Sequence, residues 1–467
     1  MSQKADSKKQ SEGSSAPRLA AKLGLFDATM IVMGGMVGGG IFINPYVVAE
    51  RVHTPVLIVG VWAIGGVVAL FGAFVYAELG ARLPRAGGEY AYLRDAFHPL
   101  LGFLYGWVAL LVIGPGGAAA VAVTFARYAQ QLLKIGVPEK LLAVAAVAML
   151  TVINCYGVRS GSNVQSLLMI LKSLALAGLI ACGAWYLAGR PEIAAATTGS
   201  SAMEGHVSLG LFGALGAAMV PVMFSYGGWQ TGNFVAAEIR NPRKNLSRGL
   251  LLGVAGVVVL YVAANFVYVG VLGPAGLAAS HTPGFEVMQR VAGARGAAFI
   301  AIGISISALG FLSQTVLTYP RVLFAMAEDG LMPRGMARLH PRYRVPVIAI
   351  ALLGAITIAA ILLGNYEQLL NYVEAMDCLF FGATAACLFL FRRRDALAGG
   401  NSSAQHGGYR LPGHPITTIV FIAVCWAVVG VTLYRYPSNS LIGFAILLTG
   451  VPAYFLWRKL ARKADAH

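Results

Sequence analysis

Residues 30–43, MIVMGGMVGGGIFI, place three consecutive glycines, Gly38 to Gly40, inside the first long apolar stretch of the chain. A second glycine pair interrupts the sixth apolar stretch, within VPVMFSYGGWQ at residues 220–230. Unwound backbone inside a bilayer leaves amides and carbonyls without partners, at a cost of several kcal/mol each. It is therefore tolerated only beside protein, water or a ligand. The two breaks indicate a binding site.

The composition is that of an all-α integral membrane protein. Hydrophobic residues make up 58% of the chain and charged residues 12%, and the mean hydropathy is +0.71. Apolar runs of roughly 20 residues, the length that a bilayer core requires, occur about twelve times. No histidines share metal-ligand spacing, and there is no phosphate-binding loop motif. We therefore expect twelve transmembrane helices, no enzymatic activity, no metal or other cofactor, and no ATP-driven transport.

The basic residues predict the orientation in the membrane. Of the 35 lysines and arginines, 26 fall in segments that share one side with the N-terminus and seven fall on the other. Only Arg127 and Lys172 lie within spans. This asymmetry follows the positive-inside rule, so both termini are expected in the cytoplasm of a bacterial-type inner membrane. The net charge of +16 is explained in this way and does not indicate nucleic acid.

The spacing of the two breaks predicts an internal repeat. Five spans separate them, and because five is odd, the two broken spans cross the membrane in opposite directions. Broken helices in corresponding positions are typical of inverted-repeat transporters. The sequence thus predicts two halves, 23–192 and 193–395, followed by an accessory segment 396–467 with two spans. Residues 1–22, rich in Ser and Lys, are expected to form a disordered cytoplasmic tail, and residues 273–296 a sizeable external loop.

The chemistry of the breaks matches a zwitterion. Where the first helix stops after Met36, the free amides of the segment beginning at Gly39 can hold a carboxylate. Carbonyls left unpaired around Phe224 to Gly227 form a negative pole that suits an ammonium group. Together they fit the two ends of a free amino acid. The alternative is that these glycines only allow helices to pack closely.

Several linked motifs carry a resemblance to a known family. They are Gly38-Gly39-Gly40-Ile41-Phe42, Tyr76-Ala77-Glu78-Leu79-Gly80, Gly87-Gly88-Glu89-Tyr90, and Phe224 to Trp229 followed by Glu238 and Asn241-Pro242. Their order resembles the amino acid, polyamine and organocation transporter superfamily, above all its L-type amino acid transporter branch. The resemblance implies a five-plus-five inverted-repeat (LeuT-type) fold with discontinuous helices 1 and 6, and secondary transport of amino acids by alternating access.

The resemblance also implies roles for individual residues. Gly39 and Gly40 match the motif that meets the substrate carboxylate, and Phe224 and Gly227 match the carbonyls that meet its amino group. Phe224 further matches an outer gate, and Gln230 a position near the substrate, although Gln230 can instead solvate the broken helix. Met36 and Ile41 complete the expected pocket. Many relatives carry Ser where this chain has Gly39, so carboxylate recognition is expected to rest on backbone amides.

Lys172 is an ionisable residue in the middle of the fifth apolar stretch. An ionised side chain there needs a partner. In L-type relatives a lysine at this position resembles a tether between the unwound first helix and the eighth, where Ser305 and Ser307 are candidate partners. It fills the space that sodium takes in sodium-coupled relatives. A plain structural role and a proton carrier remain open as alternatives.

Glu374 and Asp377, three residues apart in the tenth apolar stretch, lie on one helical face. They are candidates for a proton or cation site, although an external vestibule or neighbouring polar groups can also accommodate them.

The expected function is sodium-independent exchange of neutral amino acids. The alternatives are proton-coupled symport and a membrane receptor or channel that binds an amino acid without coupled turnover. The expected partners are the amino acid and the lipid bilayer. None of the five cysteines lies in an external loop, so no disulfide-linked companion is expected.

Overall fold

Long apolar sequences form long helices in this protein. The computed structural model describes residues 23–133, 136–156, 159–192, 209–343, 345–364, 366–397 and 409–464. The expected tail, 1–22, lies outside these residues, as does most of the segment that joins the two predicted halves. Eight helices are long and apolar enough to cross a membrane, and a ninth span is added when α2 (Leu25–Met36) and α3 (Gly40–Val52), bent by 41°, are taken together.

The elements of the first half begin with this bent pair. They continue with α4 (Pro55–Arg82), α5 (Glu89–Ala96), α6 (Pro99–Val108), the π-helical turn η1 (Ala109–Ile113), α7 (Gly114–Leu133), α8 (Glu139–Cys155) and α9 (Arg159–Ala188).

The second half starts with another broken span. Its elements are α11 (Leu209–Tyr226), α12 (Thr231–Phe234), η2 (Ala236–Glu238), α13 (Pro242–Ala278), α14 (Pro283–Glu328), η3 (Arg334–Ala337), α15 (Val347–Leu363) and α16 (Tyr366–Leu397). Two further helices follow, α18 (Ile416–Arg435) and α19 (Pro437–Ala464). The remaining three predicted spans correspond to the shorter helices α8, α11 and α15, of 17, 18 and 17 residues.

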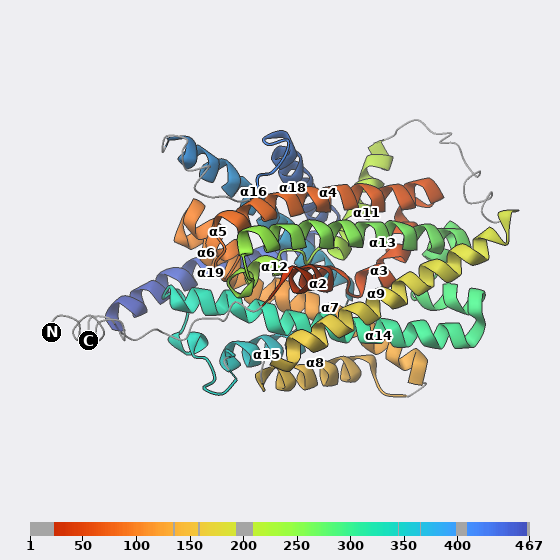
Figure 1. Cartoon of the computed structure of the whole chain (residues 1–467), viewed down its shortest axis with the longest axis horizontal. Coiled ribbons are helices and arrows are strands. Elements are labelled where there is room, and N and C mark those ends of the chain that lie inside the picture. Colours follow the sequence, from red (N-terminus) through yellow and green to blue (C-terminus); the bar gives the residue numbers. More distant parts are fainter. Residues whose placement is uncertain are drawn as a thin grey trace, which may run out of the picture.

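Helices in corresponding positions of the two halves pack against each other. The second spans, α4 and α13, run side by side along the molecule (Figure 1). The third spans, α7 and α14, and the fourth, α8 and α15, are also in contact. This pairing is what two halves related by inversion are expected to give.

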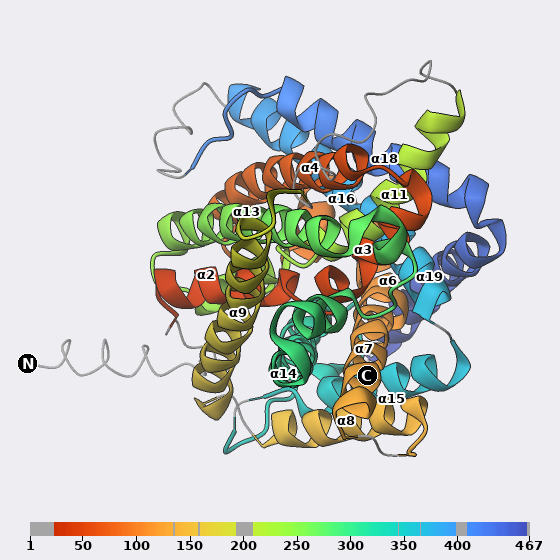
Figure 2. The ribbon, with the colours of Figure 1, turned by 90° about the vertical axis from the view of Figure 1, so that its right-hand side faces the viewer.

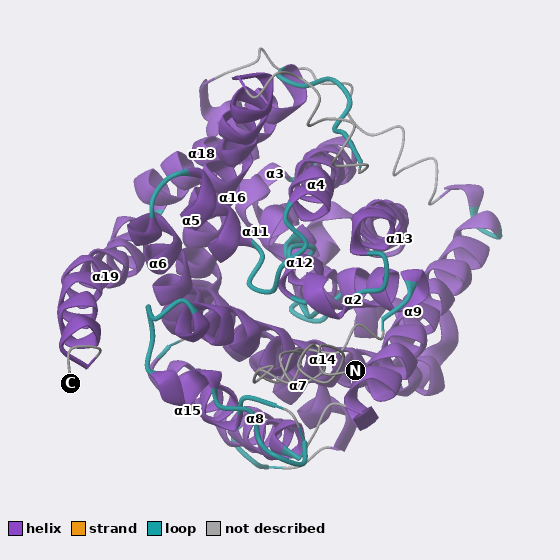
Figure 3. Cartoon of the chain, turned by 60° about the vertical axis from the view of Figure 1, so that its left-hand side comes forward, coloured by secondary structure: helices purple, strands orange, loops and turns teal. Residues whose placement is uncertain are grey.

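The two broken spans occupy the interior of the bundle. Viewed along the long axis, α3 is surrounded by other helices (Figure 2), and α12 lies centrally when the bundle is turned (Figure 3). Packing confirms this position, because α3 contacts α4, α11, α13 and α14. The accessory α18 and α19 pack on the outside against α16. The end of α19 lies at the left of Figure 1, and we call this end of the bundle the terminal end.

The segment 273–296, expected as an external loop, is largely helical. α13 continues to Ala278 and α14 begins at Pro283, with non-helical backbone only at Gly273 (φ 72°) and Gly293 (φ 64°) inside them. Glycine adopts positive φ without a Cβ clash, and proline suits the first turn of a helix. The glycines and prolines that suggested a loop therefore bend or begin helices in this segment.

Candidate functional site

The first break exposes the start of α3. Val37 N donates to Met33 O (2.8 Å) and Gly38 N to Met36 O (2.9 Å), which closes α2. The next backbone bond runs from Phe42 N to Gly39 O (3.1 Å). The amides of Gly39, Gly40 and Ile41 precede Phe42 in the sequence and so come before the first hydrogen-bonded amide of α3, as the first amides of any helix do. This end of α3 is a positive pole inside the bundle.

The second break exposes the end of α11. Gly227 N donates to Met223 O (2.8 Å), and Gly228 N donates to the Gln230 side-chain oxygen (2.9 Å). The carbonyls that follow Met223 therefore lie beyond the last bond of the helix. Gln230, expected either near the substrate or as support for the broken helix, supports it through this bond.

The two breaks touch backbone to backbone. A Cβ added to Gly35 would lie 2.5 Å from Gly228 O, and Gly228 has a φ of 107° and would overlap Gly35 O if it had a side chain. A Cβ on Gly40 would lie 2.7 Å from Ser225 Oγ. Glycine is thus required where the broken spans cross.

A small cavity of about 50 Å³ lies at this crossing. Six of the seven predicted substrate contacts line it: Met36, Gly39, Gly40, Phe224, Gly227 and Gln230. Ile41 is fully buried but is not part of the lining. Phe224 is only half-buried and stands in the wall; its role as a gate stays a prediction.

Thr124 of α7 fills the space beside Gly39. A Cβ on Gly39 would lie 2.5 Å from Thr124 Oγ1. A serine at position 39, as many relatives carry, would not fit without a shift of α7. The Thr124 hydroxyl itself donates to Ala120 O (3.0 Å) and is not part of the cavity lining.

Lys172 of α9 reaches the end of α2. Its fully buried ammonium donates to Gly34 O (2.9 Å) and Val37 O (2.6 Å), the carbonyls that the break leaves unpaired. The expected partners in α14 are not engaged, because the Ser305 and Ser307 hydroxyls have no hydrogen-bond partner among the described residues. Lys172 therefore hydrogen-bonds one of the two expected helices, and its role as a tether stays a prediction.

Glu374 and Asp377 occupy different surroundings on α16. Asp377 is half-buried and lines the cavity together with Tyr319. Glu374 is only 1% exposed, is not part of the lining, and accepts a hydrogen bond from Cys378 Sγ (2.9 Å). An external wet vestibule does not account for so buried a carboxyl. Only Asp377 of the two lines the cavity, and a proton or cation site at the two acids stays a prediction.

Comparison with known proteins agrees with this geometry. Residues 23–453 match the family model described as amino acid permease. The chain belongs to this family.

Individual relatives cover nearly the whole permease. It is 31% identical over 459 residues to the Large neutral amino acids transporter small subunit 2 of Rattus norvegicus, covering 96% of this chain and 82% of the relative. It is 30% identical to the Serine/threonine exchanger SteT of Bacillus subtilis (strain 168), over 96% and 98% of the two chains. It is 29% identical to the human Cystine/glutamate transporter, over 97% and 89%.

These matches confirm several predictions. The permease is a multi-pass membrane protein of the amino acid, polyamine and organocation superfamily, similar to the L-type branch, with the twelve-helix inverted-repeat fold of that class. It transports amino acids and is not an enzyme.

Two polar residues that join the broken spans to their neighbours were not predicted as site residues. Gln314 of α14 lines the cavity and donates to Ile31 O (2.7 Å) and Thr231 Oγ1 (3.1 Å), so it joins α2 to α12. Asn44 of α3 donates to Pro221 O (2.9 Å) and Ser225 Oγ (2.8 Å) of α11. Each is a polar residue within an apolar run, a signal that marks the position but does not identify its partner.

Backbone and side-chain contacts hold the terminal end of the permease together. Leu23 N donates to Glu238 O (2.9 Å) and Arg240 N donates to Leu23 O (2.8 Å), which joins the start of α2 to the segment after α12. Glu238 also pairs with Arg321 Nε at 3.4 Å.

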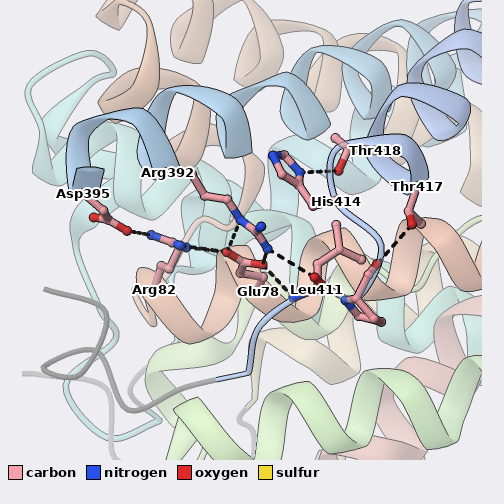
Figure 4. A network of polar contacts seen from close by, with 9 residues as sticks. Glu78, Arg82, Arg392, Asp395, Leu411, His414, Thr417 and Thr418 are labelled. Atoms are coloured by element: carbon pink, nitrogen blue, oxygen red, sulfur yellow. Dashed lines mark hydrogen bonds and ion pairs between the residues drawn. The ribbon is translucent and has the colours of Figure 1, made fainter. Parts of the chain in front are cut away.

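A buried ion network lies at the same end (Figure 4). Glu78 of α4, 1% exposed, accepts from Arg82 Nε (2.9 Å), Arg392 Nη2 (2.5 Å) and Leu411 N (2.7 Å). Arg82 also pairs with Asp395 at 2.5 Å. Figure 4 shows the Glu78 carboxylate between the two guanidinium groups, which join α4 to α16 and to the segment before α18.

Proposed function

We propose that this permease exchanges neutral amino acids by alternating access, without sodium, across a bacterial-type inner membrane. One observation carries the proposal: the amide end of α3 and the carbonyl end of α11 meet at one cavity. Opposite helix ends provide opposite partial charges. A substrate with a carboxylate beside an ammonium group uses both ends, whereas a simple anion or cation uses only one.

The names of two relatives support a substrate class and a mode of transport. One relative is named a transporter of large neutral amino acids and another a serine/threonine exchanger. The cavity wall supports neutral side chains, because Met36, Ile113, Val121 and Phe224 supply mostly apolar surface.

Asp377 favours a second candidate, a substrate with a cationic or hydrogen-bond-donating side chain. It is the acidic residue of the cavity wall, and no lysine, arginine or histidine lines the cavity among the described residues. A competition assay with all twenty amino acids would distinguish the two substrate classes.

Lys172 supports independence from sodium. A sodium ion at the end of α2 would need carbonyl oxygens as ligands, and the Lys172 ammonium already binds those of Gly34 and Val37. The lysine side chain therefore occupies the position that such an ion would take.

The terminal end is proposed to face the cytoplasm, as the distribution of lysines and arginines predicts. A disulfide-linked companion is not proposed. Cys378, Cys387 and Cys425 are buried, and Cys155 and Cys182 lie within α8 and α9.

Counterflow in proteoliposomes tests the function. Labelled amino acid should accumulate only when unlabelled amino acid is inside, with the same rate in sodium and in choline buffer. The Gly40→Leu variant is the matched control, because its side chain would enter the space between Gly40 and Ser225. Uptake that does not saturate would favour a channel. Accumulation without internal substrate, driven by a pH gradient, would favour symport.

A further inference from the structure

Glu89 is a buried carboxyl at the first position of α5, and the transport site described above does not use it. It is 0% exposed. Tyr76 of α4 donates its hydroxyl to Glu89 Oε1, and Tyr105 of α6 donates to Oε2 at 2.5 Å. Both tyrosines are themselves buried. Two neutral donors are the partners of this carboxyl.

Glu78 provides an internal comparison at the same end of the bundle. It is equally buried, yet two arginines neutralise it. No lysine, arginine or histidine of the described residues forms an ion pair with Glu89. A buried carboxylate without a counter-charge is costly, and the usual outcome is that it takes up a proton.

The other titratable groups around Glu89 add no positive charge. They come from five elements, and each interacts electrostatically with the Glu89 carboxyl: Tyr76 of α4, Tyr92 of α5, Tyr105 of α6, Tyr319 of α14, and Asp377 and Cys387 of α16. Asp377 and Tyr319 line the substrate cavity. Any charge on Asp377 therefore disfavours a second charge on Glu89.

Glu89 is joined to the inner half of the broken sixth span. Gly87 N donates to Phe234 O (3.3 Å), and a Cβ on Gly88 would lie 2.8 Å from the Phe234 ring. Asn233 of α12 donates to Tyr76 O (3.1 Å), the backbone of a residue that also binds Glu89. A displacement of α12 would therefore disturb the surroundings of the carboxyl.

A spare acceptor lies next to this arrangement. Thr384 Oγ1 of α16 is buried beside the Tyr76 hydroxyl and has no hydrogen-bond partner among the described residues. When a proton binds Glu89, its new O–H group can donate to the Tyr76 oxygen, while the Tyr76 hydroxyl turns to Thr384. The neutral form of Glu89 is thereby fully hydrogen-bonded.

A second cavity lies beside the segment that carries Glu89. A cavity of about 410 Å³ opens at the terminal end and is lined by Ala86, Tyr90 and Ala91, which flank the carboxyl in sequence, and by Ala237 just after α12. Movement of α12 away from Gly87 and Gly88 would join this cavity to the carboxyl.

We propose that Glu89 is a proton-binding site of the transport cycle, neutral while the segment Gly87–Glu89 packs on α12 and open to proton release at the terminal end when α12 moves. Burial raises the pKa of Glu89 to about 7, where both forms are accessible. The proposal rests on the proposed transport function and extends it, because it makes the rate of transport depend on pH through one residue.

The test is the pH profile of counterflow, measured with whichever of the twenty amino acids exchanges fastest and with equal pH on both sides of the membrane. The wild-type rate should change about threefold or more between pH 5.5 and 8.5, with a midpoint near 7. Glu89→Gln keeps the buried amide neutral and should flatten the profile. Tyr105→Phe removes one donor to the carboxylate and should move the midpoint upward by about one unit.

A wild-type rate that is constant over this range, or a Glu89→Gln profile equal to that of the wild type, overturns the proposal. A profile lost in Asp377→Asn but kept in Glu89→Gln would assign the proton to the cavity instead and also overturns it. Infrared difference spectra of the purified protein provide a readout that does not need transport. The carboxyl band that appears on acidification near pH 7 should be absent in Glu89→Gln. If no amino acid shows counterflow, the transport proposal fails, and this band still decides the protonation of Glu89.

Discussion

At the scale of a single residue, two independent constraints require glycine at position 228. Its φ of 107° is unfavourable for any residue with a side chain, and a Cβ would overlap Gly35 O of the first break. A neighbouring side chain can rotate away from such a contact, but a carbonyl held in a broken helix cannot. The separation of the two broken spans therefore depends on this residue.

Gly228→Ala should abolish counterflow and lower stability by about 2 kcal/mol or more, since strained backbone and overpacking each cost about 1–3 kcal/mol. Gly178→Ala in α9 is the matched control, because nothing lies within 4 Å of its added Cβ. Thermal unfolding in detergent and counterflow measure the two effects. Wild-type counterflow in Gly228→Ala would show that the breaks do not need to touch.

Asp377 is the residue whose change should affect selectivity and not folding. It faces the cavity and is half-buried, so Asp377→Asn replaces a carboxyl of the wall by an amide with little change in volume. If that carboxyl contacts the substrate side chain, inhibition by lysine and arginine should weaken about tenfold or more relative to inhibition by leucine. Glu374→Gln, which changes a carboxyl outside the cavity wall, should leave the ranking of competitors unchanged. An unaltered ranking in Asp377→Asn excludes contact with the substrate side chain.

At the scale of elements, the ion network of Figure 4 joins helices from both halves. Arg392 lies near the end of α16 and Glu78 near the end of α4, more than three hundred residues apart in the chain. Glu78 is 1% exposed, so its charge depends on the arginines. Removing one partner of a buried pair costs more than the pair contributes, because the other charge stays buried.

Arg392→Gln should therefore destabilise the permease by about 3 kcal/mol. The double variant Glu78→Gln, Arg392→Gln should recover part of that loss, since no unpaired carboxylate remains. Arg393→Gln, one residue along and exposed, serves as the control and should unfold like the wild type. Thermal unfolding in detergent provides the comparison, and additive losses in the double variant would contradict the coupling.

The sequence predicts the backbone of this protein better than it predicts the contacts of the side chains. The breaks at Gly38 to Gly40 and at Gly227 and Gly228 are predictable, because clustered glycines weaken a helix wherever they occur inside an apolar run. Gly273 and Gly293 give the same signal and suggest a loop, yet they bend helices. The sequence therefore marks where a helix is interrupted more reliably than it shows what the chain does afterwards.

Contacts between helices are the part that the sequence does not predict. Thr124 lies beside Gly39 because of the distance and rotation at which α7 packs on the first break, and neither quantity is encoded in a local pattern. Helical periodicity places Asp377 and Glu374 on one face, yet only Asp377 lines the cavity. The packing of the helices therefore decides which side chains line the pocket, whereas the glycine breaks decide where the pocket lies.

At the scale of the whole molecule, the burial of Glu89 predicts how stability depends on pH. Its folded-state pKa of about 7 lies above the ordinary value of 4.5, so the folded protein binds this proton more tightly than the unfolded chain. The contribution to stability is complete below about pH 4.5 and is lost as the pH rises through about 7. It amounts to at most about 3 kcal/mol.

The difference between wild type and Glu89→Gln isolates this contribution from the other titrating groups. The midpoint of thermal unfolding in detergent should fall between pH 5 and pH 8 for the wild type, and more gently for the variant, whose amide stays neutral throughout. The two curves should approach each other at low pH, where both side chains are uncharged, and separate as the pH rises, with the wild type becoming the less stable. Parallel curves would show that Glu89 is ionised in the folded protein as it is in the unfolded chain, which would require a counter-charge that the described structure does not place beside it.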